Sequence, residues 1–293
     1  MLELKRAIRR FVSKLTGTKK IVFFIAIAMI CVVAISIGIY TQYFYKYSET
    51  DPLMIGINIG SEKTAEELQL LEANFNSLFQ NTLKVNSENV NIVDKLEESK
   101  DLVYTGYKLE NEDENYYSVN AKIPLINISS EKAQEINKEI KAEFYDKANN
   151  IMRQTDNYVV YNVTYTAYIN ENILSLAIKS SLKEGNKSEK VSMRTYNYSL
   201  TEEKLLTLKD LIALKKDTVE NVQAKITSEI KTAYTNAKII AAEYGNLYER
   251  DVDGDMYKVE NANTFFLTDD GYVYVIYAYG NNDYTNEMDI VIF

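Results

Sequence analysis

The feature that most constrains this chain is a run of 20 residues without charge, from Ile21 to Tyr40. An α-helix rises about 1.5 Å per residue, so such a run spans about 30 Å, the thickness of the hydrocarbon core of a bilayer. Aromatic residues, which are typical of membrane interfaces, cluster at and just after the end of the run: Tyr40, Tyr43, Phe44, Tyr45 and Tyr47. We therefore expect residues 21–40 to form a single transmembrane helix.

The charges on either side of this run predict its orientation. Residues 1–20 contain seven basic residues and one acidic residue, whereas residues 21–293 contain 26 basic and 41 acidic residues, a net charge of −15. Because basic residues remain on the cytoplasmic side, we expect a cell-membrane protein with its N-terminus inside and its C-terminal domain outside the cell. A cleaved signal peptide is the alternative, although its apolar core would span only about 7–15 residues.

The basic segment 1–20 is also amphipathic, since its apolar residues share one helical face: Leu4, Ile8, Phe11 and Leu15. This pattern favours a cytoplasmic helix at the membrane interface, with its cations on anionic headgroups. A helix that binds a cytoplasmic partner is the other interpretation.

The chain contains no histidine and a single cysteine, Cys31. It therefore has no imidazole to act as a general base or metal ligand, and no pair of cysteines for a disulfide or a zinc site. An acidic stretch is similar to a calcium loop: Asp251, Asp253, Asp255 and Glu260. Such a loop needs glycine at its sixth position and glutamate at its twelfth, but Gly254 is fourth and Ala262 is twelfth. We expect a solvated turn there, and neither a metal nor a cofactor.

Beyond a stalk at residues 41–63, the patterns predict an extracytoplasmic α+β domain of antiparallel sheet with packed helices. Its first part, residues 64–157, begins with a helix capped by Thr64 and Glu67. Strands are expected within residues 101–126, around an acidic turn, and Ser130 is the expected cap of a second helix.

The second part, residues 158–293, shows the clearest β pattern. Apolar residues alternate with polar ones along residues 159–170, so Val163 and Tyr165 should face the core, and Asn162 and Thr164 the other side. Two more strands up to residue 200 complete an antiparallel meander. A short helix at residues 206–212, a long one after a capping box of Asp217 and Glu220, and a hairpin turn at Asp269–Gly271 should follow.

Several segments of the second part resemble a known ectodomain. They are a tyrosine-rich strand pair, Thr195-Tyr196-Asn197-Tyr198, Leu206–Ile212, Phe266–Gly271 and Asp289–Ile292, with Tyr117–Ile126 and Ile136-Asn137 upstream. The pattern is similar to the ectodomain shared by RsiV-type anti-sigma factors and the non-catalytic part of PdaC-type peptidoglycan deacetylases. It covers roughly residues 100–293.

This resemblance implies a single-pass protein of a Gram-positive cell envelope that binds a ligand at the cell wall. In the RsiV branch the ligand is a cationic lysozyme, and binding leads to proteolysis and release of a sigma factor. Two departures limit the comparison, because residues 1–20 are short for a sigma-binding segment and the deacetylase domain is absent. The resemblance thus supports an extracytoplasmic binding role and no catalytic residue.

The candidate binding residues from sequence are four carboxylates of the acidic turn: Glu110, Glu112, Asp113 and Glu114. They could form a rim that attracts a basic protein, or simply a solvated loop tip. We expect a membrane-tethered binding or sensor module, with lysozyme or a cell-wall component as ligand, that is not an enzyme. A glycan enzyme with two carboxylates about 5–10 Å apart is the alternative. The acidic charge argues against nucleic acid as a partner.

Overall fold

The computed structural model describes residues 63–86, 93–244 and 247–293. All of the described residues lie in one compact unit of the chain, Gly56–Phe293. The predicted transmembrane helix, the basic segment and nearly all of the predicted stalk lie outside the described residues. Within the described residues, no helix is both long and apolar enough to cross a bilayer.

The described residues form two sheets, and the larger has its strands in the order β2–β3–β4–β5–β6–β7, with β1 paired to β4. The strands are β1 (Leu83–Asn86), β2 (Val103–Asp113), β3 (Tyr117–Ile126), β4 (Val159–Asn170), β5 (Ile173–Glu184), β6 (Lys190–Ser199) and β7 (Lys204–Leu205). The meander β4–β5–β6 is antiparallel, as predicted. However, β3 and β1 both run parallel to β4, so the prediction of a purely antiparallel sheet was wrong. Between β3 and β4 the chain passes through helices that return it to the end of the sheet where β3 began. Such a crossover connection joins parallel strands, whereas a tight turn joins antiparallel ones.

The crossover helices cover one face of the large sheet. They form one continuous helical segment of α4 (Glu131–Ile140), a π-helical turn η2 (Lys141–Tyr145) and α5 (Asp146–Ile151). The Ser130 hydroxyl accepts the amide of Ala133 at 3.2 Å, which confirms the predicted cap. Val163 is fully buried beneath these helices, whereas Asn162 is half-buried, which confirms the predicted alternation over residues 159–164. Every residue from 165 to 170 is buried, so the prediction of a single buried face was wrong for the second half of β4, where the small sheet packs on the other face.

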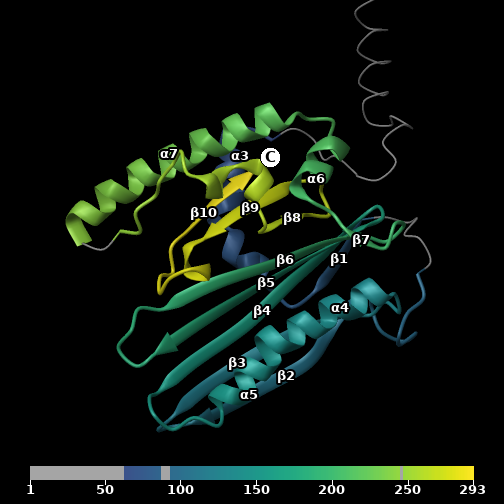
Figure 1. The fold of residues 1–293 in the computed structure, drawn as a ribbon, viewed down its shortest axis with the longest axis vertical. Coiled ribbons are helices and arrows are strands. Elements are labelled where there is room, and N and C mark those ends of the chain that lie inside the picture. The colour runs from purple at the N-terminus through teal and green to yellow at the C-terminus, as the bar shows by residue number, and fades with distance from the viewer. Residues whose placement is uncertain (1–62, 87–92, 245–246) are drawn as a thin grey trace, which may run out of the picture. The chain divides into compact units, whose positions relative to one another are not determined.

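The small sheet lies between the large sheet and a second pair of helices (Figure 1). Its strands are β8 (Phe265–Leu267), β9 (Val273–Ala278) and β10 (Met288–Ile292), and its helices are α6 (Leu208–Leu214) and α7 (Val219–Tyr244). Along β9, Tyr274 and Ile276 pack toward the large sheet, whereas Val273 and Val275 pack toward the helices. The predicted turn between β8 and β9 is present, with Gly271 at φ 85°.

Polar side chains of the large sheet bind the backbone of β8 directly. The Thr195 hydroxyl accepts the amide of Phe265 at 2.9 Å, and the Asn197 amide donates to the carbonyl of Phe265 at 2.7 Å. The Ser175 hydroxyl accepts the amide of Leu267 at 3.2 Å. These bonds satisfy the edge of β8 away from water, so the three buried polar residues fix the position of one sheet on the other.

Capping boxes were predicted at the starts of two helices, and one of them is present. The first described helix, α3 (Ala65–Ala73), has the predicted capping box of Thr64 and Glu67. The predicted box at the start of α7 was wrong, because the Thr218 hydroxyl, one residue after Asp217, accepts the amide of Asn221 at 3.2 Å. Short 3₁₀ turns complete the described elements: η1 (Phe75–Leu78), η3 (Asp255–Tyr257), η4 (Val259–Asn261) and η5 (Tyr279–Asn281).

Candidate binding site at the end of helix α7

The four carboxylates predicted as a binding rim lie on the β2–β3 hairpin, which we call the acidic hairpin. Strand pairing continues to Asp113 opposite Tyr117, so only Glu114 lies in the turn itself. Glu110 and Glu112 therefore share one side of the strand, and Asp113 points to the other. The Lys108 ammonium lies 2.8 Å from Glu110, and its hydrogen bond lowers the pKa of that carboxyl. The four groups do not converge on one site.

A cavity of about 1030 Å³ lies elsewhere, and we call it the end cavity. It is bounded by the C-terminal part of α7, the segment that follows α7, the loop before β10 and the turn between β5 and β6. Its apolar wall comprises Ala237, Ile240, Ala241 and Leu247, and its carboxylates are Glu189, Glu249, Asp283 and Glu287. The remaining lining residues are Ser188, Tyr248, Tyr284, Thr285 and Asn286. Among the described residues, the lining of this cavity contains no lysine and no arginine.

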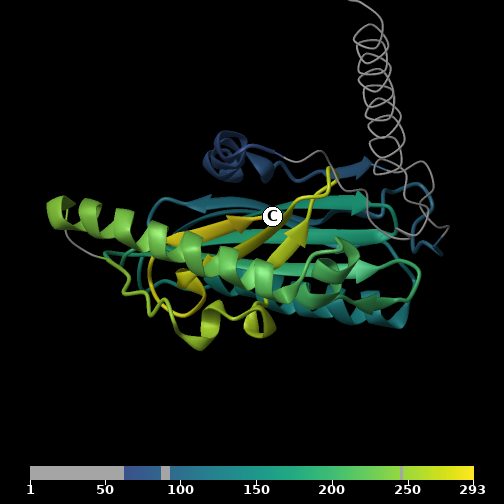
Figure 2. The same ribbon diagram turned by 90° about the horizontal axis from the view of Figure 1, so that it is seen from above.

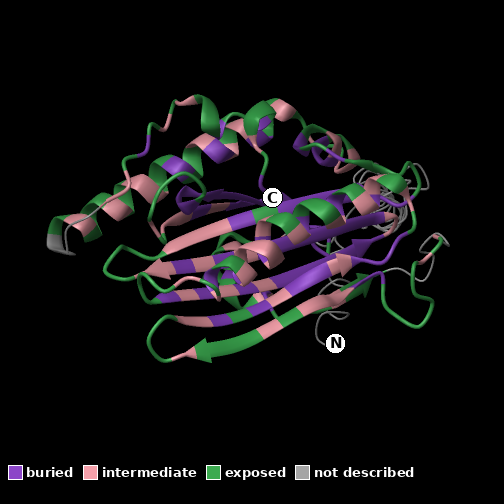
Figure 3. Cartoon of the chain, turned by 60° about the horizontal axis from the view of Figure 1, so that its bottom comes forward, coloured by how far each residue is buried: buried purple, intermediate pink, exposed green. Residues whose placement is uncertain are grey.

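The apolar wall is the continuation of the core-facing stripe of α7. Val222, Ile226 and Ile230 are fully buried against the small sheet. From residue 231 to residue 242 no residue of the helix is buried (Figure 3). At about 1.5 Å per residue this 26-residue helix is about 39 Å long, whereas a six-residue strand spans about 20 Å. The end of α7 therefore projects beyond the small sheet (Figure 2).

Three of the four cavity carboxylates have no cationic partner among the described residues. Glu249 accepts a hydrogen bond from the hydroxyl of Tyr234, and the Asp283 carboxylate accepts the amide of Tyr284 at 2.7 Å. Neither they nor Glu189 form an ion pair within the described chain. Cations nevertheless lie close to other lining residues, since the Arg250 guanidinium is 3.1 Å from Glu287, and the ammonium groups of Lys187 and Lys190 are 4.8 and 5.6 Å from the Tyr284 ring centre. The described lining thus includes three carboxylates that are not in an ion pair, and basic side chains lie beside it.

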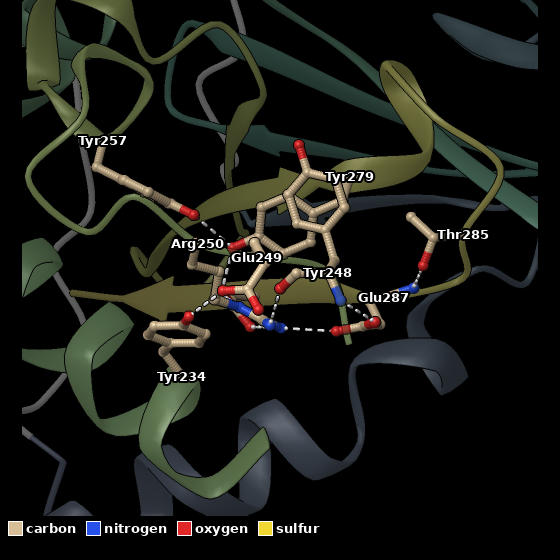
Figure 4. A network of polar contacts seen from close by, with 9 residues as sticks. Tyr234, Tyr248, Glu249, Arg250, Tyr257, Tyr279, Thr285 and Glu287 are labelled. Atoms are coloured by element: carbon tan, nitrogen blue, oxygen red, sulfur yellow. Dashed lines mark hydrogen bonds and ion pairs between the residues drawn. The ribbon is translucent and has the colours of Figure 1, made fainter. Parts of the chain in front are cut away.

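The fourth carboxylate belongs to a polar network that supports the cavity (Figure 4). Its centre is Arg250, whose side chain is 3% exposed. The guanidinium donates to both oxygens of Asp289, at 2.7 and 3.1 Å, and lies 3.1 Å from Glu287. It also donates to the carbonyl of Tyr248 at 3.0 Å. Since paired bonds between charged groups are strong and directional, Arg250 anchors the segment after α7 to β10.

Two tyrosines extend this network into the core. The Tyr279 hydroxyl donates to Asp289, the Tyr257 hydroxyl lies 2.8 Å from that of Tyr279, and the rings of Tyr248 and Tyr279 stack at 4.2 Å. Burial raises the pKa of Tyr257 to about 12, and burial together with the Asp289 charge raises the pKa of Tyr279 further. Burial opposes the charge of Arg250, but its bond to Asp289 prevails and raises its pKa. At neutral pH the tyrosines therefore remain protonated and Arg250 remains charged.

The network also holds the loop that forms the far wall of the cavity. The Glu287 carboxylate accepts the amide of Tyr248 at 2.8 Å, and the Thr285 hydroxyl accepts the amide of Glu287 at 3.1 Å. The Thr285 carbonyl in turn accepts the amide of Val191 at 3.0 Å, which ties the loop to β6. Both walls are therefore fixed by buried or backbone hydrogen bonds.

The stretch that is similar to a calcium loop forms an ordinary turn. Asp255 lies 2.5 Å from the Lys258 ammonium, and Asp253 lies 3.9 Å from that of Lys231. The amide of Gly254 donates to the carbonyl of Asp251 at 2.8 Å and closes the turn. Across residues 63–86, 93–244 and 247–293, no three potential metal-binding side chains gather in one place.

No family model matches the chain, and no curated protein matches it. A DUF3298 family protein from Pseudomonas aeruginosa is 14% identical, with a TM-score of 0.34 over 58% of this chain and 77% of that protein. A member of the same family from Bacteroides fragilis is 12% identical, with a TM-score of 0.28 over 55% of this chain and 74% of that protein. The structural neighbours of this chain are thus DUF3298 family proteins.

Proposed function

We propose that this chain is a membrane-tethered binding or sensor module of the cell envelope, that it binds a cationic protein outside the membrane, and that it is not an enzyme. The observation on which the proposal rests is the end cavity, where Glu189, Glu249 and Asp283 form no ion pair within the described chain and none of the described lining residues is basic. The uncharged run at residues 21–40 and the basic segment before it support the tether.

The electrostatics favour a cationic ligand. Carboxylates of one sign along a concave surface with apolar walls concentrate the electric field and raise the local concentration of cations. Such a field speeds association more than it slows dissociation, and salt screens it over about 8 Å at physiological ionic strength. Lysozyme, the cationic ligand of the RsiV-type proteins that the sequence resembles, is the first protein to try.

The test compares two triple variants with equal changes of charge. One replaces Glu189, Glu249 and Asp283 in the cavity by Gln, Gln and Asn, and the other replaces Glu110, Glu112 and Glu114 of the acidic hairpin by Gln. With the full chain in nanodiscs and lysozyme immobilised, surface plasmon resonance should show association about tenfold slower at low salt for the cavity variant. The hairpin variant should change it less than about twofold, because its charges do not converge.

Several results would contradict the proposal. If the hairpin variant alone slows association, the acidic hairpin is the site and the cavity is not. If an unrelated protein of equal positive charge binds as well as lysozyme does, no specific cationic protein is recognised. Release of new reducing ends from purified cell wall would show the alternative, a carboxylate-dependent glycan enzyme. Protease added to intact cells should digest the C-terminal domain, and protection of that domain would exclude the topology.

A further inference from the structure

We propose that the end cavity binds a cationic amphipathic segment of its partner, with apolar side chains against the exposed end of α7 and lysine or arginine side chains toward the cavity carboxylates. This inference rests on the proposed function and adds the chemical form of the ligand. It assigns part of the recognition to apolar contact, which a purely electrostatic site would not need.

The first argument is the uncovered apolar face of α7. Ala237, Ile240 and Ala241 follow at steps of three and one along the helix and line the cavity together with Leu247. Ile240 is 61% exposed, although the same stripe is fully buried only ten residues earlier at Ile230. An amphipathic helix buries its apolar face against a partner. For the last turns of α7, no element of the described chain is that partner.

The second argument is the arrangement of charge around this face. Glu249 follows closely on Leu247, while Glu189 and Asp283 belong to the turn and the loop on the other walls. Carboxylates thus border an apolar strip. Its complement is a segment whose apolar side chains are flanked by cations, as on an amphipathic basic helix.

The third argument is size. A volume of about 1030 Å³ lies at the upper end of the range for pockets that hold small molecules, about 300–1,000 Å³. It is large enough for several side chains of one segment and far too small for a folded domain. A protein ligand would therefore insert a protruding segment and leave its remaining surface outside the cavity.

Charge separates this occupant from two others. A second copy would present an acidic C-terminal domain, since residues 21–293 have a net charge of −15, and its basic segment 1–20 is expected on the other side of the membrane. Anionic lipid headgroups would meet the same repulsion from Glu189 and Asp283. A cationic segment of another protein is the occupant that both the apolar face and the carboxylates favour.

The chain offers a matched pair of variants for the test. Ile239 and Ile240 are neighbours on α7 and are 69% and 61% exposed, but only Ile240 lines the cavity. Ile240→Ser and Ile239→Ser remove the same apolar surface and should both leave the melting temperature within about 2 °C of the parent, because neither side chain is buried. They should differ only in binding.

The probe is an 18-residue peptide of leucine and lysine, immobilised, with leucine at helical spacing. Its controls are a scrambled peptide of the same composition and an oligolysine of equal charge. With the full chain in phosphatidylcholine nanodiscs and empty nanodiscs as reference, Ile240→Ser should raise the Kd for the amphipathic peptide about tenfold, and Ile239→Ser less than about twofold. The parent should bind the amphipathic peptide at least about tenfold more tightly than either control.

Equal effects of the two substitutions, or equal binding of the three peptides, would overturn the inference. If lysozyme binding still depends on Glu189, Glu249 and Asp283 while Ile240→Ser changes nothing, the inference fails and the proposed function stands. If neither set of residues affects binding, both fail. If Ile240→Ser lowers attachment to lipid vesicles and not to the peptide, the occupant is a membrane and the inference is wrong.

Discussion

Replacing Val163 by Asp should lower the free energy of unfolding by about 4 kcal/mol or more, because it places a carboxylate in the core without a partner. Val163 is 0% exposed and lies at the middle of β4, with Ala121 of β3 on one side and Ser180 of β5 on the other. Since both neighbours fix the register of β4, the strand cannot slip by one residue to turn the new charge outward.

The control is the adjacent residue. Asn162 is half-buried on the opposite face, and its amide donates to the hydroxyl of Ser181 at 3.2 Å. Asn162→Asp adds the same charge at the cost of one partly solvated hydrogen bond, so a loss of about 1 kcal/mol is expected. Urea denaturation measures the free energy of unfolding of both variants. Similar losses for the two variants would contradict the assignment of the buried face.

Replacing Arg250 by Met should be the second large effect, with a loss of about 3–5 kcal/mol, because it leaves Asp289 buried without its counter-ion. Asp289 is 6% exposed, and Glu287 and the carbonyl of Tyr248 lose the same donor. The substitution should also loosen the cavity walls, since Arg250 joins the segment after α7 to β10.

A double-mutant cycle identifies the cause of that loss. Asp289→Asn removes the buried charge that Arg250→Met leaves without a counter-ion. The side-chain oxygen of the new asparagine can still accept the hydroxyl of Tyr279. The double variant should therefore be more stable than the sum of the single losses predicts, by about 2 kcal/mol. Denaturant unfolding of the four proteins gives this coupling energy. Strict additivity would show that the Arg250–Asp289 pair adds nothing beyond packing.

The predictions that held depend on local chemistry. The caps at Thr64 and Ser130 need only groups three residues apart, and the alternation along the first half of β4 needs only the period of a strand. The cap of α7 was placed one residue early because Asp217 and Thr218 are both good caps, and the sequence does not rank them. The acidic hairpin was predicted as a turn because its residues are turn formers, but pairing with β3 extends the strand to Asp113.

The candidate site could not be predicted in the same way. Glu189, Glu249 and Asp283 are separated by 60 and 34 residues in the sequence, and nothing local joins them. The visible signal was the pair Ile239 and Ile240 near the end of a long amphipathic pattern, and that pattern does not reveal where the sheet beneath the helix ends. The need for glycine at position 280 could not be predicted either. An added Cβ there would lie 1.9 Å from the carbonyl oxygen of Val191 on β6, and this close approach exists only in the folded chain.

The sequence by itself determined the uncharged run, the charge imbalance, the caps at Thr64 and Ser130 and the inward face of the first half of β4, since these depend on neighbours within a few residues. Tertiary structure alone decided that β3 and β4 run parallel and that α7 extends beyond the small sheet. It also decided that Ser175, Thr195 and Asn197 bind the edge of β8. The physical reason is that strand direction, sheet docking and the meeting of distant carboxylates depend on contacts between residues far apart in the chain, whose relative positions exist only once the core has packed.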